Sequence, residues 1–212
     1  MLRHRQRGVT LIELAIGLAI LAILVTLGLP EFREFIRNTK VKNVAQSIET
    51  GLQLARAEAL RLNAPVRFQF VSDMTSSCAI ATGGTTGSPS WVVSRDNPAG
   101  ACNAAPSPTT APRIIQKWDA RETSAGITWD ITLVNTSAVG GAITFNGLGR
   151  VSPPLPGTAE IHVEPDGTGE MACTYASASG TVRCMRLQIT NGGEIKMCDP
   201  KVTDATDPRI CS

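Results

Sequence analysis

The chain has 212 residues, of which 42% are hydrophobic and 18% are charged, and its formal net charge is +2. Three of the positive charges, Arg3, Arg5 and Arg7, precede a long apolar segment, so the remaining side chains carry a net charge of −1. A chain so close to neutrality does not favour nucleic-acid binding through overall charge. Aromatic residues are few at 4%, whereas Gly (19) and Pro (13) are plentiful, which is typical of a β-rich domain with many loops.

Residues 9–29 form an apolar segment that is long enough to cross a bilayer, because a hydrocarbon core of about 30 Å needs roughly 20 apolar residues in a helix. The segment contains one charged residue, Glu13, near its start. A charge at the bilayer centre costs roughly 2.5–3.5 kcal/mol or more. Glu13 therefore needs either a position near the membrane surface or a cationic partner in a bundle of packed helices.

The start of this segment resembles the type IV prepilin signature. Gly8 ends a short basic leader, and VTLIE follows at residues 9–13, with Val9 at a position where phenylalanine is usual. The resemblance implies cleavage by prepilin peptidase between Gly8 and Val9, and methylation of the new amino terminus at Val9. It also implies that Glu13 neutralises the terminal amine of a neighbouring subunit during assembly. An ordinary signal peptide would instead end its apolar region in an A-x-A-like site.

The sequence predicts one helix over residues 9–62, with residues 9–29 in the membrane or the filament core. After Pro30 the pattern becomes amphipathic, and Asn63 and Pro65 are expected to end the helix. The predicted buried face has apolar residues at helical spacing, which are Val41, Val44, Ala45, Ile48, Leu52, Ala55, Ala59 and Leu62.

Beyond Pro65 the pattern predicts strands separated by turn residues. The predicted strands are Val66–Phe70, Trp91–Ser94, Ile127–Leu133, Ala142–Phe145, Ala159–Val163, Val182–Ile189 and Glu194–Met197. The sequence Asn191-Gly192-Gly193 between the last two predicts a hairpin turn. Residues 99–112 are rich in Ala, Pro, Ser and Thr, which indicates a surface loop.

Three segments of this region resemble the GspH/FimT (FimU-like) family of minor pilins and pseudopilins. They are QLARAEALRLNAPVRF at residues 53–68, ITFNGLGR at 143–150 and RLQITNGGEIKMC at 186–198. The resemblance implies an α+β, pilin-like fold in which the long helix packs on two antiparallel sheets. It divides the chain into a leader (1–8), the helix (9–62) and a globular periplasmic domain (63–212).

Six cysteines follow the apolar segment, and they are Cys78, Cys102, Cys173, Cys184, Cys198 and Cys211. An even number at wide spacing in an exported domain favours disulfides over zinc, which would need close CxxC or Cys/His pairs. Fifteen pairings are conceivable. We favour the three that join sequence neighbours, Cys78–Cys102, Cys173–Cys184 and Cys198–Cys211, with Cys184–Cys198 as an alternative.

No pattern in the chain favours catalysis, a cofactor or a metal. His162, with Glu164 and Asp166, is better explained as part of one solvated strand face, because the residues around it alternate. Asp166 to Glu170 lacks the ligand density of a calcium-binding EF-hand loop and is predicted to be a turn. No GxSxG motif stands before a helix. The chain is therefore predicted not to be an enzyme.

The resemblance favours a structural subunit that helps to initiate assembly near the tip of a type IV pilus or a type II secretion pseudopilus, and both machines remain open. It implies a single-pass protein of the bacterial inner membrane with its globular domain in the periplasm. Its partners would be prepilin peptidase and other major and minor pilins or pseudopilins.

The alternative is a pilin that binds DNA for uptake, since some FimT-like members do so through a basic GRxR-type pattern. The aligned residues here are Gly193-Glu194-Ile195-Lys196, in which an acid replaces an arginine. Residues 185–212 carry four cations and four anions, whereas DNA affinity depends largely on clustered cations. Contact with DNA would then depend on convergence of Arg183, Arg186 and Lys196, and we favour the assembly role.

Overall fold

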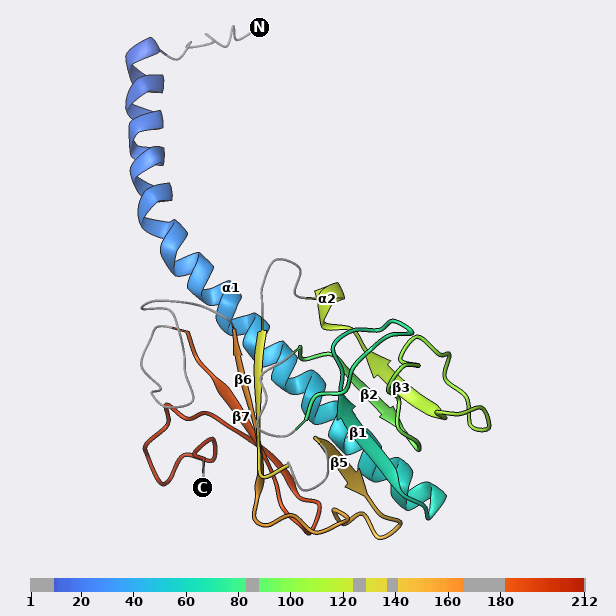
Figure 1. The fold of residues 1–212 in the computed structure, drawn as a ribbon. Coiled ribbons are helices and arrows are strands. Elements are labelled where there is room, and N and C mark those ends of the chain that lie inside the picture. Colours follow the sequence, from blue (N-terminus) through green and yellow to red (C-terminus); the bar gives the residue numbers. More distant parts are fainter. Residues whose placement is uncertain (1–9, 83–87, 124–128, 137–140, 166–181, 212) are drawn as a thin grey trace, which may run out of the picture. The chain divides into compact units, whose positions relative to one another are not determined.

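A computed structural model describes residues 10–82, 88–123, 129–136, 141–165 and 182–211. The chain forms two compact units, Met1–Arg37 and Asn38–Ser212, and one long helix contributes to both. The second unit also holds all the strands of the described residues (Figure 1). The elements in chain order are α1 (Leu11–Leu62), β1 (Val66–Phe70), β2 (Trp91–Ser94), β3 (Ile114–Trp118), α2 (Ala120–Thr123), β4 (Trp129–Val134), β5 (Ala142–Phe145), β6 (Ala159–Pro165), β7 (Met185–Ile189) and β8 (Ile195–Cys198).

The strands form two antiparallel sheets of four strands each, in the orders β3-β2-β1-β5 and β4-β6-β7-β8. In the first sheet the central position of β1 is fixed by pairing on both sides, because Phe68 lies opposite Val93 of β2 and Ile143 of β5. In the second sheet Ile161 of β6 lies opposite both Leu133 of β4 and Leu187 of β7. The α+β architecture predicted from the sequence is therefore present, with a helix and two antiparallel sheets.

The main core is built from one face of α1 and the inner faces of both sheets. The helix contributes the predicted apolar stripe from Val41 to Ala59, whose side chains are 0–2% exposed, and Leu62 packs against the cluster with part of its surface exposed. Phe68, Trp91 and Phe145 come from the first sheet, and Leu187 comes from the second. The second compact unit begins at Asn38, because this part of α1 is an integral component of the core.

The end of α1 follows from two residues. Asn63 adopts a left-handed conformation with φ of 46°. Its N–H donates to the carbonyl of Leu60 (3.3 Å), and the N–H of Ala64 donates to the carbonyl of Ala59 (3.2 Å). These two bonds form a Schellman motif, which satisfies carbonyls that the helix leaves free at its end. The predicted end of the helix at Asn63 is therefore confirmed.

Two elements were not expected from the sequence. Strand β3 lies at the edge of the first sheet, beside β2, and the short helix α2 follows it. The sequence of β3, IIQKW, does not alternate between apolar and polar residues, which is why the pattern missed it. The loop before β3 was predicted to lie on the surface at residues 99–112. Two of its residues, Cys102 and Pro112, are buried.

Candidate functional site: the amino-terminal helix and the last hairpin

The amino-terminal end of α1 presents a single carboxylate on an apolar helix. The hydroxyl of Thr10 accepts a hydrogen bond from the N–H of Glu13 (3.3 Å), and the carbonyl of Thr10 accepts one from the N–H of Leu14 (3.1 Å). Thr10 therefore caps the helix and places Glu13 in its first turn, where the helix dipole favours a negative charge. The processing residues Gly8 and Val9 lie outside the described residues.

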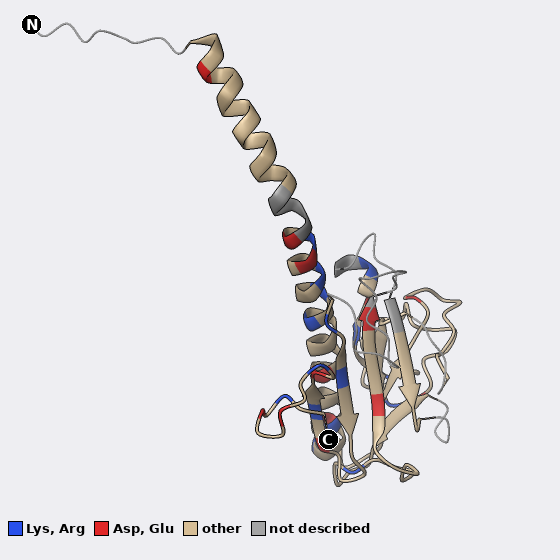
Figure 2. Ribbon diagram, turned by 90° about the vertical axis from the view of Figure 1, so that its left-hand side faces the viewer, with Lys and Arg blue, Asp and Glu red and all other residues tan. Residues whose placement is uncertain are grey.

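The side chains around Glu13 find no cover within the described chain. The large apolar residues from Leu11 to Val25 are between 87% and 47% exposed. In the sequence of α1, Glu13 is the one charged residue before Glu31. Figure 2 shows that the amino-terminal part of the helix is drawn almost entirely in the colour of uncharged residues. By length and composition this helix is able to cross a membrane.

Two disulfides join cysteines that are both among the described residues, and both hold loops of the globular unit. Cys78 is bonded to Cys102 and Cys198 to Cys211, which are two of the three predicted pairs. Cys184 is also disulfide-bonded, while its predicted partner, Cys173, lies outside the described residues. No described cysteine is a free thiol.

The three cations proposed for DNA contact do not form one exposed basic cluster in the described structure. Arg183 is 53% exposed, and its Nη1 lies 2.8 Å from an Asp199 oxygen. Arg186 of β7 lies 3.6 Å from a Glu160 oxygen of β6. Lys196 of β8 is opposite Gln188, on the same sheet face as Arg186. Acidic side chains thus offset the charge of both arginines.

The face of β6 that carries His162 is covered, which corrects the prediction of a solvated face. His162 is only 3% exposed and Glu164 is 9% exposed. The alternation along β6 was correct, but both faces of this strand are shielded from water, and alternation cannot distinguish a covered polar face from an open one. His162 Nε2 lies 3.2 Å from a Glu160 oxygen, and Arg186 lies opposite it on β7.

This environment favours a neutral imidazole. Burial and, to a smaller extent, the positive charge of Arg186 together lower the pKa of His162 from 6.5 to about 4, against the opposing effect of Glu160. Among the described residues, no group of three or more His, Cys, Asp and Glu side chains is placed to hold a metal ion. Asp166 and the turn predicted up to Glu170 lie outside the described residues.

The last hairpin instead makes a close backbone contact with the turn that follows β5. A Cβ atom at Gly193 would lie 2.0 Å from the carbonyl oxygen of Gly149, and both glycines have positive φ values, of 82° and 71°. The side chain of Asn191 donates to the carbonyl of Leu155 (3.1 Å) and accepts from its N–H (2.7 Å). Gly193 is therefore required for packing between the two sheets, a role that its position in the sequence did not indicate.

Comparison with known proteins assigns the chain to a family. The family described as type II transport protein GspH matches residues 44–193. The chain belongs to the GspH family. The prokaryotic N-terminal methylation motif matches residues 3–29. No curated protein sequence matches the chain.

Two solved structures are similar to this GspH-family chain, and both are crystal structures of the type IV minor pilin FimU from Pseudomonas aeruginosa, in space groups P65 and P21. Each is 15% identical to the chain with a TM-score of 0.44, and each is covered over 97% of its length. They cover 76% and 79% of the chain, respectively.

The GspH match begins within the buried stripe of α1 and ends at the glycine of the sheet-to-sheet contact, Gly193. It therefore spans most of the core, while β8 and the Cys198–Cys211 disulfide lie beyond it. The family is one of minor pilins and pseudopilins, and the methylation motif implies processing by prepilin peptidase and assembly with other pilins. The motif and the apolar helix indicate a membrane-anchored chain with a globular part.

Proposed function

We propose that the chain is a minor pilin or pseudopilin that helps to initiate filament assembly and lies near the tip of a type IV pilus or a type II secretion pseudopilus. The observation that carries the proposal is the placement of Glu13 as the one charge in the exposed apolar part of α1, before Glu31. A carboxylate enclosed in an apolar bundle is costly unless a cation offsets it. The amino terminus of a neighbouring subunit supplies such a cation.

The location of each part follows from the same proposal. Prepilin peptidase removes residues 1–8 after Gly8 and methylates Val9. Residues 9–29 then lie in the bacterial inner membrane until they enter the filament core, and residues 63–212 form the globular domain in the periplasm. The match of the methylation motif to residues 3–29 supports this division, because the motif contains both the cleavage position and the apolar segment.

The test separates processing from assembly. Gly8→Ala should leave the leader uncut, because the peptidase needs a minimal residue before the cleaved bond. Glu13→Ala should be cut normally but should be reduced at least about tenfold in sheared filaments, because its partner amine would lack an anion. Mass spectrometry of the mature chain and immunoblots of the filament fraction measure the two steps.

Glu31→Ala is the matched control, because Glu31 is an exposed glutamate of the same helix outside the apolar segment. It should be processed and incorporated like the wild type. Normal incorporation of Glu13→Ala, or an equal loss in the control, would contradict the proposed pairing.

The alternative function in DNA uptake predicts a different result. Because Arg183 and Arg186 already lie beside acidic groups, we expect weak binding or none at physiological salt. A gel-shift titration with double-stranded DNA at two salt concentrations measures this. Micromolar binding that weakens steeply with salt and is lost when Arg186 and Lys196 are both changed to Ala would favour DNA uptake instead.

A further inference from the structure

A pocket of about 340 Å³ lies between the C-terminal end of α1 and the loop that joins β2 to β3. One part of its lining is apolar, formed by Leu62 of α1, by Ile114 and Ile115 of β3, and by Pro106 and Pro108 of the loop. Its volume is at the lower end of the range for ligand-binding pockets, about 300–1,000 Å³. The pocket therefore has room for one side chain and its neighbours.

The charged part of the lining contains one acid, Glu58, and three arginines, two of which are already paired. Arg61 lies 2.6 Å from a carboxylate oxygen of Glu58, one turn earlier in α1. Arg113 forms a two-bond ion pair with Asp96, in which its Nε donates at 2.6 Å. This guanidinium holds the pKa of Asp96 below its usual range, so the pair stays ionised at neutral pH.

Arg95 is the third arginine, and its charge is not offset in the same way. Its Nε is buried and donates to no acceptor in the described part of the chain. Arg95 is near enough to Asp96 that its charge helps to lower the pKa of that carboxyl, but Asp96 forms its ion pair with Arg113. The backbone N–H of Arg95 donates to the carbonyl of Arg113 (3.2 Å). A buried donor without an acceptor costs free energy that a bound anion would recover.

The wall of the pocket is fixed from the far side. The Cys78–Cys102 disulfide ties the β2–β3 loop to the segment after β1. The ammonium group of Lys117 in β3 donates to the carbonyls of Cys102, Asn103 and Ala104 at 3.0–3.1 Å. Because the loop is held at several points, the pocket is preorganised and little ordering is needed on binding.

We propose that this pocket binds one acidic side chain carried on an apolar peptide segment of a neighbouring filament subunit, with Arg95 as the anchor for its carboxylate. A guanidinium pairs with a carboxylate through two parallel hydrogen bonds, and the apolar lining suits the flanking side chains of a peptide. That the neighbour is a filament subunit rests on the proposed function. The binding itself does not, because it is measurable on the isolated chain.

Charge favours a peptide over a nucleic acid at this site. A nucleic-acid backbone needs several cations along its path, whereas here two of the three arginines that line the pocket are already paired with acids. An inorganic anion would satisfy Arg95 but would leave the apolar lining unused. A peptide and an inorganic anion are therefore expected to bind with different affinities, which a titration can measure.

The test is calorimetric titration of the full chain in micelles of an uncharged detergent. The probes are a five-residue blocked peptide with Glu flanked by isoleucines, the same peptide with Gln in place of Glu, and inorganic phosphate. We expect the Glu peptide to bind with Kd below about 1 mM and the Gln peptide to bind at least about tenfold more weakly, since one ion pair separates them. Phosphate should bind more weakly than the Glu peptide.

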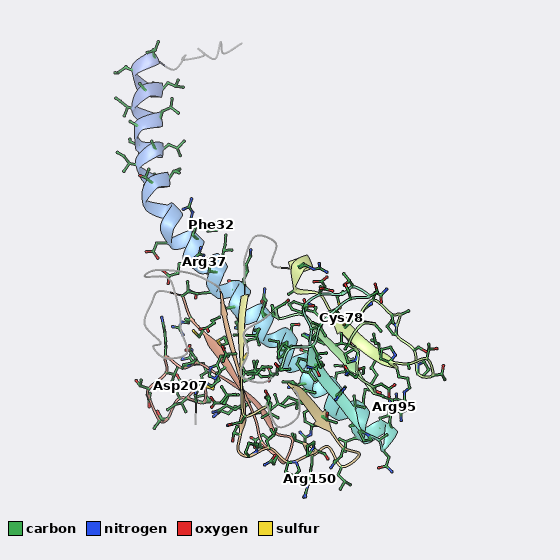
Figure 3. All side chains as sticks on the ribbon, in the orientation of Figure 1. Phe32, Arg37, Cys78, Arg95, Arg150 and Asp207 are labelled. Carbon is green, nitrogen blue, oxygen red and sulfur yellow. A yellow bond between two sulfur atoms is a disulfide. The ribbon has the colours of Figure 1, made fainter. Side chains whose placement is uncertain are left out.

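Two variants locate the site. Arg95→Gln should abolish the preference for Glu over Gln, and Arg95→Lys should retain part of it, because a lysine keeps the charge but not the fork. Arg150→Gln is the matched control, since Arg150 is an exposed arginine away from the pocket (Figure 3). Unchanged melting temperatures would show that the variants fold.

The proposal would be overturned by equal affinity for the Glu and Gln peptides, or by equal losses in Arg95→Gln and Arg150→Gln. Phosphate binding as tightly as the Glu peptide would exclude a peptide-specific site. None of these results depends on filament incorporation, so they are separate from failure of the Glu13 experiment.

Discussion

The two parts of α1 have the same secondary structure but opposite surroundings. From Leu11 to Val25 the large apolar side chains are at least 47% exposed, whereas the apolar stripe from Val41 to Ala59 is at most 2% exposed. The second part is covered by sheets that the same chain supplies. The first part has no such cover, so its apolar surface needs a membrane or other subunits. The difference shows which part of the helix the chain stabilises by itself.

The largest effect is expected from removing apolar volume in the two parts. Leu52→Ala should lower the free energy of unfolding of the globular unit by about 2–5 kcal/mol, because Leu52 is fully buried. Leu18→Ala should leave it unchanged, since Leu18 is 58% exposed. Denaturant unfolding followed by tryptophan fluorescence measures this, because all three tryptophans lie beyond residue 90. Equal effects would refute the comparison.

The second-largest effect is expected from lowering the pH, which should reduce the stability of the globular unit. The pKa of His162 is lower in the folded state, about 4, than its ordinary 6.5. The unfolded chain then binds more protons between these values, so stability should fall as the pH is lowered from about 6.5 to 4, by up to about 3 kcal/mol. Residues 10–37 contain no histidine, so this effect of pH should be confined to the globular unit. The same unfolding experiment at pH 7 and pH 4.5 measures the loss, which His162→Gln should reduce.

The glycines of α1 provide a third contrast. A Cβ at Gly51 would lie 2.7 Å from the ring of Phe68 and 3.0 Å from that of Trp91, so Gly51→Ala should destabilise the globular unit by about 1–3 kcal/mol. A Cβ at Gly17 would meet nothing within 4 Å. Gly17→Ala should therefore favour the helix, by up to about 1 kcal/mol. Thermal unfolding and helix content from circular dichroism check the pair, and stabilisation by Gly51→Ala would count against it.

The smallest effect on stability is expected from removing a side-chain hydroxyl group in each part of α1. Ser47 accepts a hydrogen bond from Trp91 Nε1 (3.0 Å), and Ser47→Ala should cost about 1 kcal/mol by leaving that donor without its acceptor. Thr26 donates to the carbonyl of Ile23 on an exposed turn of the same helix (2.8 Å), and Thr26→Ala should have no effect on the globular unit. A shift in the denaturation midpoint for Thr26→Ala but not for Ser47→Ala would reverse the expected order.

Local patterns predicted the elements whose signal lies within a few residues. The helical spacing from Val41 to Ala59 identified the buried stripe, and Asn63 identified the end of the helix. The alternation of Val66–Phe70 identified β1, and Asn191-Gly192-Gly193 identified the last turn. Each of these features follows from the geometry of one element.

Features that depend on distant segments were missed or wrong. Gly149 and Gly193 meet although 44 residues separate them, and nothing local to either turn indicates the contact. The polar residues of β6 indicated an open face, but tertiary packing covers His162. The ion pair of Arg183 with Asp199 likewise joins residues that are 16 positions apart, and no local pattern indicates it. The apolar pocket at Arg95 was invisible for the same reason, because its lining comes from α1, β3 and a long loop.

The position of the Cys78–Cys102 disulfide has a consequence for the order of maturation. Both cysteines belong to a small apolar cluster with Val71, Val92 and Ile114, while the main core contains no cysteine among the described residues. The main core is therefore able to collapse in the reduced chain, and oxidation then closes the peripheral loop around it. Because Cys78 and Cys102 are at most 3% exposed, the folded loop shields the bond from reductants, and the bond holds the pocket wall rather than the main core.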